Sequence, residues 1–285
     1  MIRIGLTGWG DHDDLYPHGL AASDKLNEYS KHFSIVEVDS SFYAVQPTRN
    51  YQKWIRDTPE SFQFIVKAYQ GMTGHLRGKS PFIDQREMFS AFKESIHPLV
   101  EAGRLAMVLC QFPPWFDCKK ENVAKLRDCK TRLEGLPVAL EFRHQSWFTP
   151  SFKEQTLDFM KEEQWIHSIC DEPQAGLGSV PTVLEPTDSD KTLIRFHGRN
   201  DKGWVAPGDG SWRDVRYLYR YSKDELSEWV SHLEKLNEKT KEIYVLFNNN
   251  SGGDAAQNAK ELERLLGHEP LPLAPRQISL FDDLN

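Results

Sequence analysis

The chain has 285 residues, of which 39% are hydrophobic and 27% charged, and its formal net charge is −7 at pH 7. This composition is typical of a globular protein with enough apolar residues for a sizeable core. The negative charge argues against a broad surface that coats nucleic acid, so we expect no strong autonomous nucleic-acid binding. No apolar run is long enough to span a membrane, and Met1 leads into a predicted strand without a signal peptide. We therefore expect a cytoplasmic protein with no membrane partner.

Eight segments share one pattern, in which a β-rich apolar run ends in polar residues. They are 2–9, 35–43, 62–69, 104–112, 138–147, 165–172, 192–199 and 243–250. Segments with helical periodicity follow most of them. These are 25–32, 47–57, 84–102, 122–133, 151–163, 222–239 and 255–266. Ser151 and Glu154 have the spacing of a capping box at the start of one such helix.

Strands that alternate with helices predict a parallel sheet. Eight such units need about 250 residues, so we expect one closed (β/α)₈ TIM barrel over 1–267. An open doubly wound sheet is the alternative, but no GxGxxG turn follows the first strand. The proline-containing stretch 173–190 predicts an irregular connection between strands 6 and 7. The proline-rich segment 268–285 predicts a flexible C-terminal tail.

Strand side chains alternate between the two faces of a sheet, which predicts what points into the barrel. Within 138–147, one face carries Glu141, Arg143 and Gln145. If Leu140 and Phe142 face outward onto a helix, the charged side chains point inward. The same parity groups residues of two further segments. These groups are Glu37, Asp39 and Ser41, and Arg195, His197 and Arg199.

Active sites of TIM barrels lie at the C-terminal ends of the strands. Polar residues occupy these ends along the chain, namely Glu37, Asp39, Ser41, Lys67, Gln111, Glu141, Arg143, Asp171, Arg195, His197, Arg199, Asn248 and Asn250. Charges near a barrel interior are costly unless they are paired or used, so their convergence predicts a ligand site. The alternative is an internal salt-bridge network, in which Glu37 and Glu141 pair with Arg143, Arg195 and Lys67.

Acid–base chemistry is one possibility, with Glu141 as the general base and Lys67 or His197 as the acid. Arginines 143, 195 and 199, together with Lys67, suit the binding of a phosphate or carboxylate. The turn at 248–253 precedes the last helix, where barrels often hold phosphate. A trio of His197, Asp171 and Glu37 is conceivable if the strand registers agree.

Metal binding is not predicted. The loop with Asp11, His12, Asp13, Asp14 and His18 contains suitable ligand types, but such a loop is more often solvated. No cofactor is expected either. The four cysteines lack CxxC spacing and are expected to be reduced thiols, namely Cys110, Cys118, Cys129 and Cys170.

Motifs from nearly every predicted strand together resemble the domain of unknown function 72 family, the YecE-like barrels. They are Thr7-Gly8-Trp9, Glu37 with Ser40-Ser41-Phe42-Tyr43, Lys67-Ala68, Gln111-Phe112-Pro113-Pro114, Glu141-Phe142-Arg143 with Trp147, Arg195-Phe196-His197-Gly198-Arg199, and Phe247-Asn248-Asn249 with Asn258-Ala259. The resemblance covers about residues 1–266. It implies a TIM barrel with these residues around its mouth, so Trp9, Tyr43 and Asn249 join the predicted substrate-binding residues.

The resemblance implies no settled biochemical activity, because the family is described as sugar-isomerase-related only by distant fold similarity. Two positions depart from the family pattern. Asp39 stands where an Asn is usual, and Gly74 separates Thr73 from His75 where Thr-His is frequent. If the usual Asn binds ligand, an Asp at this position changes the polarity of the site.

The tail carries a second resemblance. Gln277-Ile278-Ser279-Leu280-Phe281 resembles the pentapeptide by which bacterial DNA polymerases and repair proteins dock on the sliding clamp. An extended segment with a Gln and adjacent Leu and Phe, tethered by a Pro-rich linker, suits a polar contact beside a hydrophobic pocket. The alternative is that Leu280 and Phe281 fold back onto the barrel.

Three functions follow as hypotheses. The first is an enzyme with acid–base or hydrolytic chemistry on a small anionic substrate, phosphorylated or derived from a sugar or nucleotide. The second is a DNA-maintenance factor that the clamp recruits, since recruitment raises local concentration. The third is a non-catalytic barrel that binds one metabolite.

Overall fold

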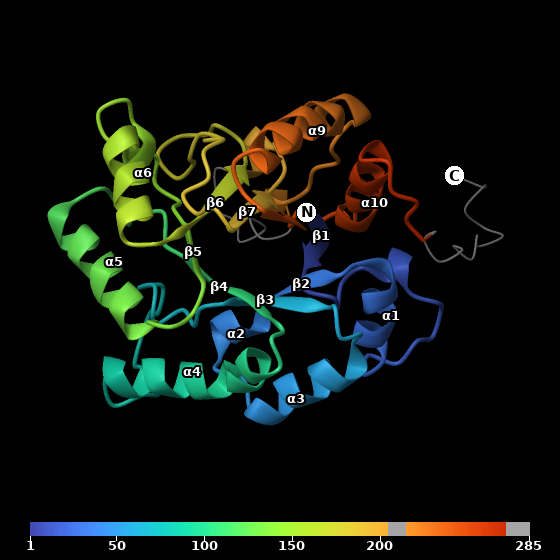
Figure 1. Ribbon diagram of the computed structural model, residues 1–285, viewed down its shortest axis with the longest axis horizontal. Coiled ribbons are helices and arrows are strands. Elements are labelled where there is room, and N and C mark those ends of the chain that lie inside the picture. Colours follow the sequence, from blue (N-terminus) through green and yellow to red (C-terminus); the bar gives the residue numbers. More distant parts are fainter. Residues whose placement is uncertain (205–214, 272–285) are drawn as a thin grey trace.

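The computed structural model describes residues 1–204 and 215–271 of the chain. Its centre is a closed barrel of eight parallel strands in chain order, so the predicted TIM barrel is confirmed. Figure 1 shows helices surrounding these strands. The strands are β1 (Ile2–Thr7), β2 (Ile35–Val38), β3 (Gln63–Lys67), β4 (Leu105–Gln111), β5 (Val138–Glu141), β6 (Ile166–Asp171), β7 (Lys191–Phe196) and β8 (Glu242–Phe247).

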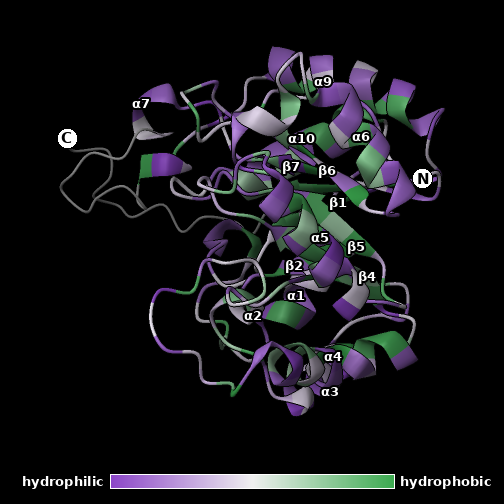
Figure 2. Cartoon of the chain, turned by 90° about the vertical axis from the view of Figure 1, so that its left-hand side faces the viewer, coloured by the Kyte–Doolittle hydropathy of each residue, from purple (hydrophilic) through white to green (hydrophobic). Residues whose placement is uncertain are grey.

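The predicted helices form with small shifts at their ends. The α-helices are α1 (Lys25–His32), α2 (Ser40–Tyr43), α3 (Thr48–Asp57), α4 (Gln85–Glu101), α5 (Lys120–Arg132), α6 (Lys153–Glu162), α7 (Asp201–Trp204), α9 (Lys223–Asn237) and α10 (Ala255–Leu265). Two 3₁₀ turns, η1 (Asp13–Leu15) and η2 (Gln145–Phe148), lie between them. Figure 2 shows the N-terminus at one end of the barrel and α7 at the opposite end.

Two apolar layers surround the strands. The inner layer fills the barrel with alternate side chains such as Ile35, Ile65 and Leu246, and the outer layer packs the strands against the helices. Strands β1 and β2 approach closely at Gly5, where a Cβ atom would lie 2.2 Å from the carbonyl oxygen of Ile35. A glycine is therefore required at this position in β1.

The strands end before the last residue of the predicted segments, and two of them, β2 and β5, end much earlier because local hydrogen bonds bend the chain. β2 stops at Val38, and the hydroxyl of Ser41 donates to the carbonyl oxygen of Val38 at the start of α2. β5 stops at Glu141, and the backbone N–H of Ser146 then donates to Nδ1 of His144 within η2. Beyond Val38 a turn therefore replaces the expected alternation, whereas Arg143, two residues beyond β5, still lies on the inner side beside Glu141, as predicted.

The connection from β6 to β7 is irregular, as predicted, and residues 173–190 contain no helix. The capping box predicted at Ser151 does not form. Helix α6 begins at Lys153 without a side-chain cap, because the carbonyl oxygen of Thr149 accepts the N–H groups of Phe152 and Lys153. A capping box does form at the start of α9, between Ser222 and Glu225.

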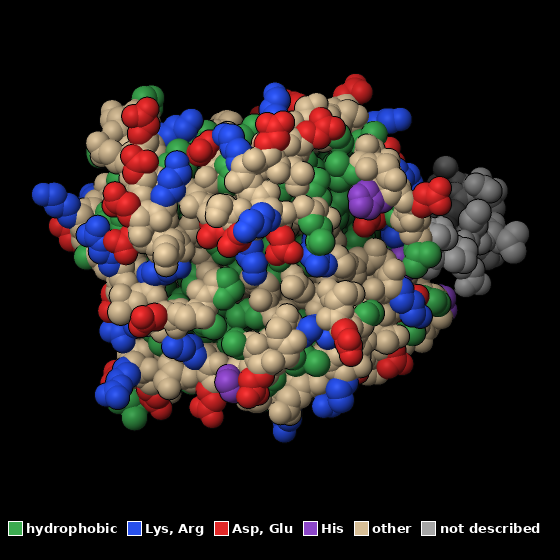
Figure 3. Space-filling model, viewed as in Figure 1, with side chains coloured by type: hydrophobic (Ala, Val, Ile, Leu, Met, Phe, Trp, Pro, Cys, Tyr) green, Lys and Arg blue, Asp and Glu red, His purple; other side chains and the backbone are tan. Residues whose placement is uncertain are grey.

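The surface seen in Figure 3 mixes acidic and basic side chains over the whole visible face. Within 1–204 and 215–271, no helix has the length and apolarity needed to cross a bilayer. The tail residues predicted to bind the clamp, Gln277, Ile278, Leu280 and Phe281, lie outside the described residues.

Candidate functional site

A network of buried charges lies at the C-terminal end of the barrel, here called the mouth. Its centre is Arg195 on β7, which is 1% exposed. Nε and Nη2 of Arg195 donate to Glu37 at 3.0 and 2.9 Å, and Nη1 donates to both carboxylate oxygens of Glu141 at 3.0 and 2.9 Å. Nη1 also lies 3.4 Å from Oε1 of Gln111. Side chains from strands β2, β4, β5 and β7 thus meet at one guanidinium group, and the strand alternation predicted Glu37, Glu141 and Arg195 on the inner face.

Arg143 continues this network toward β6. Its Nε lies 3.0 Å from Oε1 of Glu141, and its Nη1 donates to Glu172. Glu172 also accepts the backbone N–H of Val180 at 2.7 Å. Burial raises the pKa of Glu172 to about 7, although Arg143 favours the ionised carboxylate.

The sequence pattern predicted Asp171 as the site residue at the end of β6, whereas the structure places the adjacent Glu172 in the network. The side chains of β6 that point into the barrel are those of Ser168 and Cys170, and Glu172 continues this alternation. The hydroxyl of Ser168 donates to Glu141 at 3.0 Å. Asp171 points to the other side and accepts hydrogen bonds from Arg199, Tyr221 and Trp229. The conceivable trio of His197, Asp171 and Glu37 therefore does not form.

His197 lies beside Glu141 at the end of β7 and is fully buried. Asn248 donates to Nδ1 of His197 at 3.0 Å, which assigns the ring proton to Nε2, 3.6 Å from Oε1 of Glu141. Burial, reinforced by Arg143, holds the pKa of His197 well below its usual value, so the ring is neutral. Burial opposes ionisation of Glu141, but Arg195 and Arg143 outweigh it and hold that pKa well below its usual range. The site therefore pairs an ionised carboxylate with a neutral imidazole.

Lys67 is the most accessible cation of this group, with 13% of its side chain exposed. Its Nζ donates to Asp39 at 2.9 Å, and Asp39 is one-third exposed. Burial opposes the charge of Lys67, but Asp39 and Glu37 outweigh it and raise the lysine pKa. Asp39 precedes α2, and the hydroxyl of Ser41 bonds the carbonyl oxygen of Lys67 at 2.6 Å. The sequence predicted Asp39 and Ser41 on one face of a strand. The chain instead turns into α2 here, and the Asp39 carboxylate contacts Nζ of Lys67.

Four predicted binding residues lie apart from the charge network. Trp9 packs against Trp54, with ring centroids 5.1 Å apart, and Tyr43 is 59% exposed. The side-chain amide of Asn249 donates to the carbonyl oxygen of Tyr219 and to Oδ1 of Asn258, so these bonds give Asn249 a structural role. Arg199 pairs with Asp171 and Glu225.

A backbone turn explains the position of Arg199. Gly198 has a φ of +85°, and a Cβ atom there would lie 2.6 Å from Cβ of Tyr219. The turn ends the strand alternation after His197, so Arg199 does not share a face with Arg195. The predicted alternation therefore fails after His197, as it does after Val38.

Three side chains within the described ranges have the chemistry of a metal site. The ligand atoms of Glu141, Cys170 and His197 all lie within 4.8 Å of one another. However, Arg195 and Arg143 both pair with Glu141, and burial raises the pKa of the Cys170 thiol well above its usual value. Two guanidinium charges and a protonated thiol do not suit a divalent cation.

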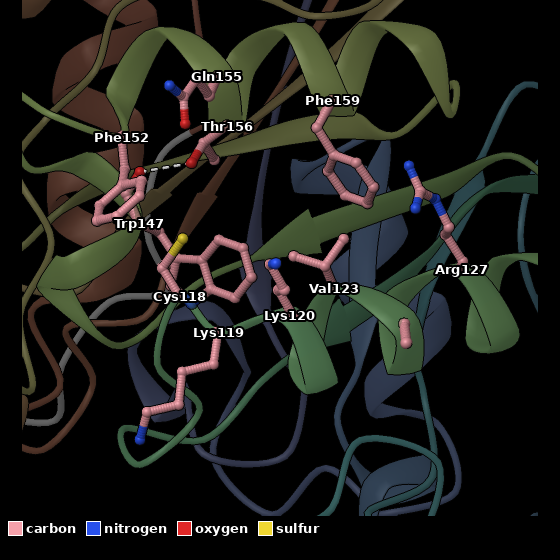
Figure 4. Close-up of a pocket in the computed structure, with 11 residues that line it drawn as sticks. Cys118, Lys119, Lys120, Val123, Arg127, Trp147, Phe152, Gln155, Thr156 and Phe159 are labelled. Atoms are coloured by element: carbon pink, nitrogen blue, oxygen red, sulfur yellow. Dashed lines mark hydrogen bonds between the residues drawn. The ribbon is translucent and has the colours of Figure 1, made fainter.

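A separate hollow of about 550 Å³ lies outside the barrel between α5 and α6 (Figure 4). Its floor includes Val123, Trp147 and Phe159, and Figure 4 shows Arg127 at one side of it. The guanidinium of Arg127 lies 2.7 Å from Glu163. None of the residues that line this hollow belongs to the charge network.

Comparison with known proteins gives a consistent result. Residues 3–279 match the family described as "Protein of unknown function DUF72". The UPF0759 protein YunF of Bacillus subtilis is 63% identical over 282 residues, which cover 99% of this chain and 100% of YunF. The UPF0759 protein YecE of Escherichia coli is 25% identical over 173 residues, which cover 59% of this chain and 58% of YecE.

Solved structures agree. A DUF72 family protein from Enterococcus faecalis superposes with a TM-score of 0.89 at 39% identity, covering 98% of this chain and 100% of that one. A DUF72 family protein from Thermotoga maritima gives 0.79 at 32% identity, covering 94% and 100%. With the sequence match spanning nearly the whole barrel, the chain belongs to the DUF72 family of TIM-barrel proteins.

Proposed function

We propose that the mouth of the barrel binds a small anionic substrate, phosphorylated or derived from a sugar or nucleotide, and performs acid–base or hydrolytic chemistry on it. The observation that carries this proposal is the convergence of ionisable side chains, all buried except the half-buried Lys67, from the ends of strands β2, β3, β5, β6 and β7. They are Glu37, Lys67, Glu141, Arg143, Glu172, Arg195 and His197.

A structural role alone explains this convergence poorly. Barrel interiors are normally filled with branched apolar side chains. Buried ion pairs are seldom more stabilising than apolar residues of the same volume. The alternative is an internal salt-bridge network, and Arg195 does pair with Glu37 and Glu141 as that alternative requires. We infer that the network serves function, because it holds fixed charges around the place where a substrate would react.

The contacts divide the roles among the residues. Arg143, Arg195 and Lys67 all bind carboxylates, but Lys67 and its partner Asp39 are the more exposed pair, so Lys67 is the cation best placed to contact an incoming anion. Glu141 is held ionised and can accept a proton. His197 directs its Nε2 toward Glu141 and can pass a proton to or from it.

Glucose 6-phosphate and AMP are the two probes. Calorimetry measures their binding, and NMR of the reaction mixture measures their turnover. Lys67→Ala should lose binding of the phosphates. Glu141→Gln should keep binding and lose turnover. Binding without turnover in the wild-type protein would favour the non-catalytic barrel. Binding and turnover that are unchanged in both variants would refute the assigned roles.

We also propose that the sliding clamp recruits this protein in DNA maintenance. The observation that favours this second function is the sequence Gln277–Phe281 behind the prolines of the tail. Peptides of this kind bind at about 1 μM, equivalent to about −8 kcal/mol. Surface plasmon resonance on a bacterial clamp should show micromolar binding, lost when Gln277, Leu280 and Phe281 are all changed to Ala. If the wild type and the triple variant bound the clamp equally, the pentapeptide would be excluded as the binding segment.

A further inference from the structure

Aromatic side chains from three successive loops meet beside Lys67 at the mouth. They are Phe42 and Tyr43 in α2, His75 between β3 and α4, and Trp115 between β4 and α5, here called the aromatic wall. The ring centroids of Phe42 and Tyr43 are 5.3 Å apart. Those of Phe42 and His75 are 5.1 Å apart, and those of His75 and Trp115 are 5.9 Å apart. The four rings therefore form one row of edge-to-face contacts, with interplanar angles of 90°, 78° and 67°.

The row is held in place by its own loops. The backbone N–H of Gln70 donates to the carbonyl oxygen of Phe42 at 2.9 Å, which ties α2 to the loop that follows β3. The hydroxyl of Thr73 lies 2.9 Å from Nδ1 of His75, and the N–H of His75 donates to the carbonyl oxygen of Gln70. Thr73 is 2% exposed, so this support is buried.

The two ends of the row are partly exposed, and the guanidinium of Arg77 lies over the Trp115 ring, 5.3 Å from its centroid. The exposed fractions of Tyr43 and Trp115 are 59% and 53%. Large aromatic side chains that remain this exposed mark contact sites more often than isolated surface residues do. In contrast, the inner members contact the charged site, since Nζ of Lys67 lies 4.8 Å from the ring centroid of Phe42. A ligand on the wall would thus reach both apolar ring faces and a cation.

We propose that the aromatic wall is the subsite that binds the ring of the substrate, and that the substrate carries a ring with an apolar face. Sugar pyranoses and nucleobases share this chemistry, and both stack on aromatic side chains. Burial, with Lys67 and Arg143, lowers the pKa of His75 to about 4, so His75 contributes an uncharged ring at neutral pH. The inference rests on the proposed function of the mouth and adds to it the ring that the substrate must contain.

Saturation-transfer NMR and calorimetry with five probes test this subsite. Adenosine and methyl glucoside are uncharged rings, AMP and glucose 6-phosphate are charged rings, and glycerol 3-phosphate is charged without a ring. At least one ring probe should bind, and its affinity should fall roughly fivefold to tenfold in Tyr43→Ala and Trp115→Ala. Glycerol 3-phosphate should bind these variants as it binds the wild type. A preference for adenosine or for the glucoside identifies the class of ring.

Phe152→Ala is the matched control, because Phe152 is 42% exposed but lines the hollow between α5 and α6. It should leave every affinity unchanged, and all three variants should keep the wild-type melting temperature. The subsite is overturned if no ring probe binds, or if the ring probes bind Tyr43→Ala and Trp115→Ala as tightly as the wild type. If uncharged rings bind through Trp115 while no phosphate binds, the subsite holds and the anionic substrate of the proposed function fails.

Discussion

Each guanidinium group at the mouth compensates two buried carboxylates. Arg195 joins Glu37 to Glu141, and Arg143 joins Glu141 to Glu172. Burying an ionic group is tolerated only while its partner remains, because the lone charge has lost its water. Single substitutions in this network should therefore have much larger effects than substitutions of surface ion pairs.

Arg195→Met should lower the free energy of unfolding by about 3–5 kcal/mol, since it leaves Glu37 and Glu141 buried without their shared cation. Urea denaturation of purified protein measures this loss. Arg127→Met is the control, because its pair with Glu163 is at the surface, and it should cost less than about 1 kcal/mol. Equal losses in the two variants would show that Arg195 stabilises its buried carboxylates no more than Arg127 stabilises a surface carboxylate.

Glu172 should make stability depend on pH. Its pKa is raised to about 7 in the folded protein from 4.5, so between these values the folded state binds more protons than the unfolded state. The free energy of unfolding should therefore fall as pH rises through this window, by up to roughly 3 kcal/mol, and Glu172→Gln should remove this contribution.

The measurement is the difference in unfolding free energy between Glu172→Gln and the wild type, recorded from pH 4.5 to pH 7. The difference should shift in favour of the variant as pH rises. Glu263, whose pKa burial also raises to about 7, is common to both proteins and cancels. A difference that is constant with pH would contradict the raised pKa of Glu172.

At the scale of elements, the sequence predicted which charged side chains point into the barrel wherever the strands are regular. Glu37, Lys67 and Glu141 point inward because alternation holds to the last residue of β2, β3 and β5. It fails where a local interaction bends the backbone, as at Asp39 before α2 and at Arg199 after Gly198. Such turns depend on contacts with neighbouring loops, which no strand pattern contains.

Helix starts show the same limit. Ser151 and Ser222 both stand three residues before a Glu, but only Ser222 caps its helix. Ser222→Ala should therefore lower the free energy of unfolding by about 1 kcal/mol, whereas Ser151→Ala should change it by less than about 0.5 kcal/mol. Thermal or urea unfolding of the two variants checks this contrast, and a larger loss at Ser151 would mean that a cap forms there.

At the scale of the whole molecule, closure of the barrel joins the two ends of the described fold. β1 pairs with β8, and α10 contacts β1, so the first strand and the last helix support each other. The sequence predicted this architecture because an eightfold strand–helix repeat leaves few other arrangements. It could not rank the charged residues by accessibility, because the exposure of Lys67 and the burial of Glu141 depend on packing between distant strands.

Closure also predicts that the barrel does not need the residues after Leu271. The eight strands pair completely among themselves, and the described chain reaches Leu271, whose carbonyl oxygen accepts a hydrogen bond from Lys260. A chain that ends at Leu271 should therefore keep the melting temperature within about 2 °C of the full chain, because the eight paired strands and helix α10 all lie before Leu271. The same truncation should abolish binding to the sliding clamp. A drop of several degrees would instead mean that Leu280 and Phe281 pack on the barrel, as the alternative for the tail holds, and the motif would then serve the fold.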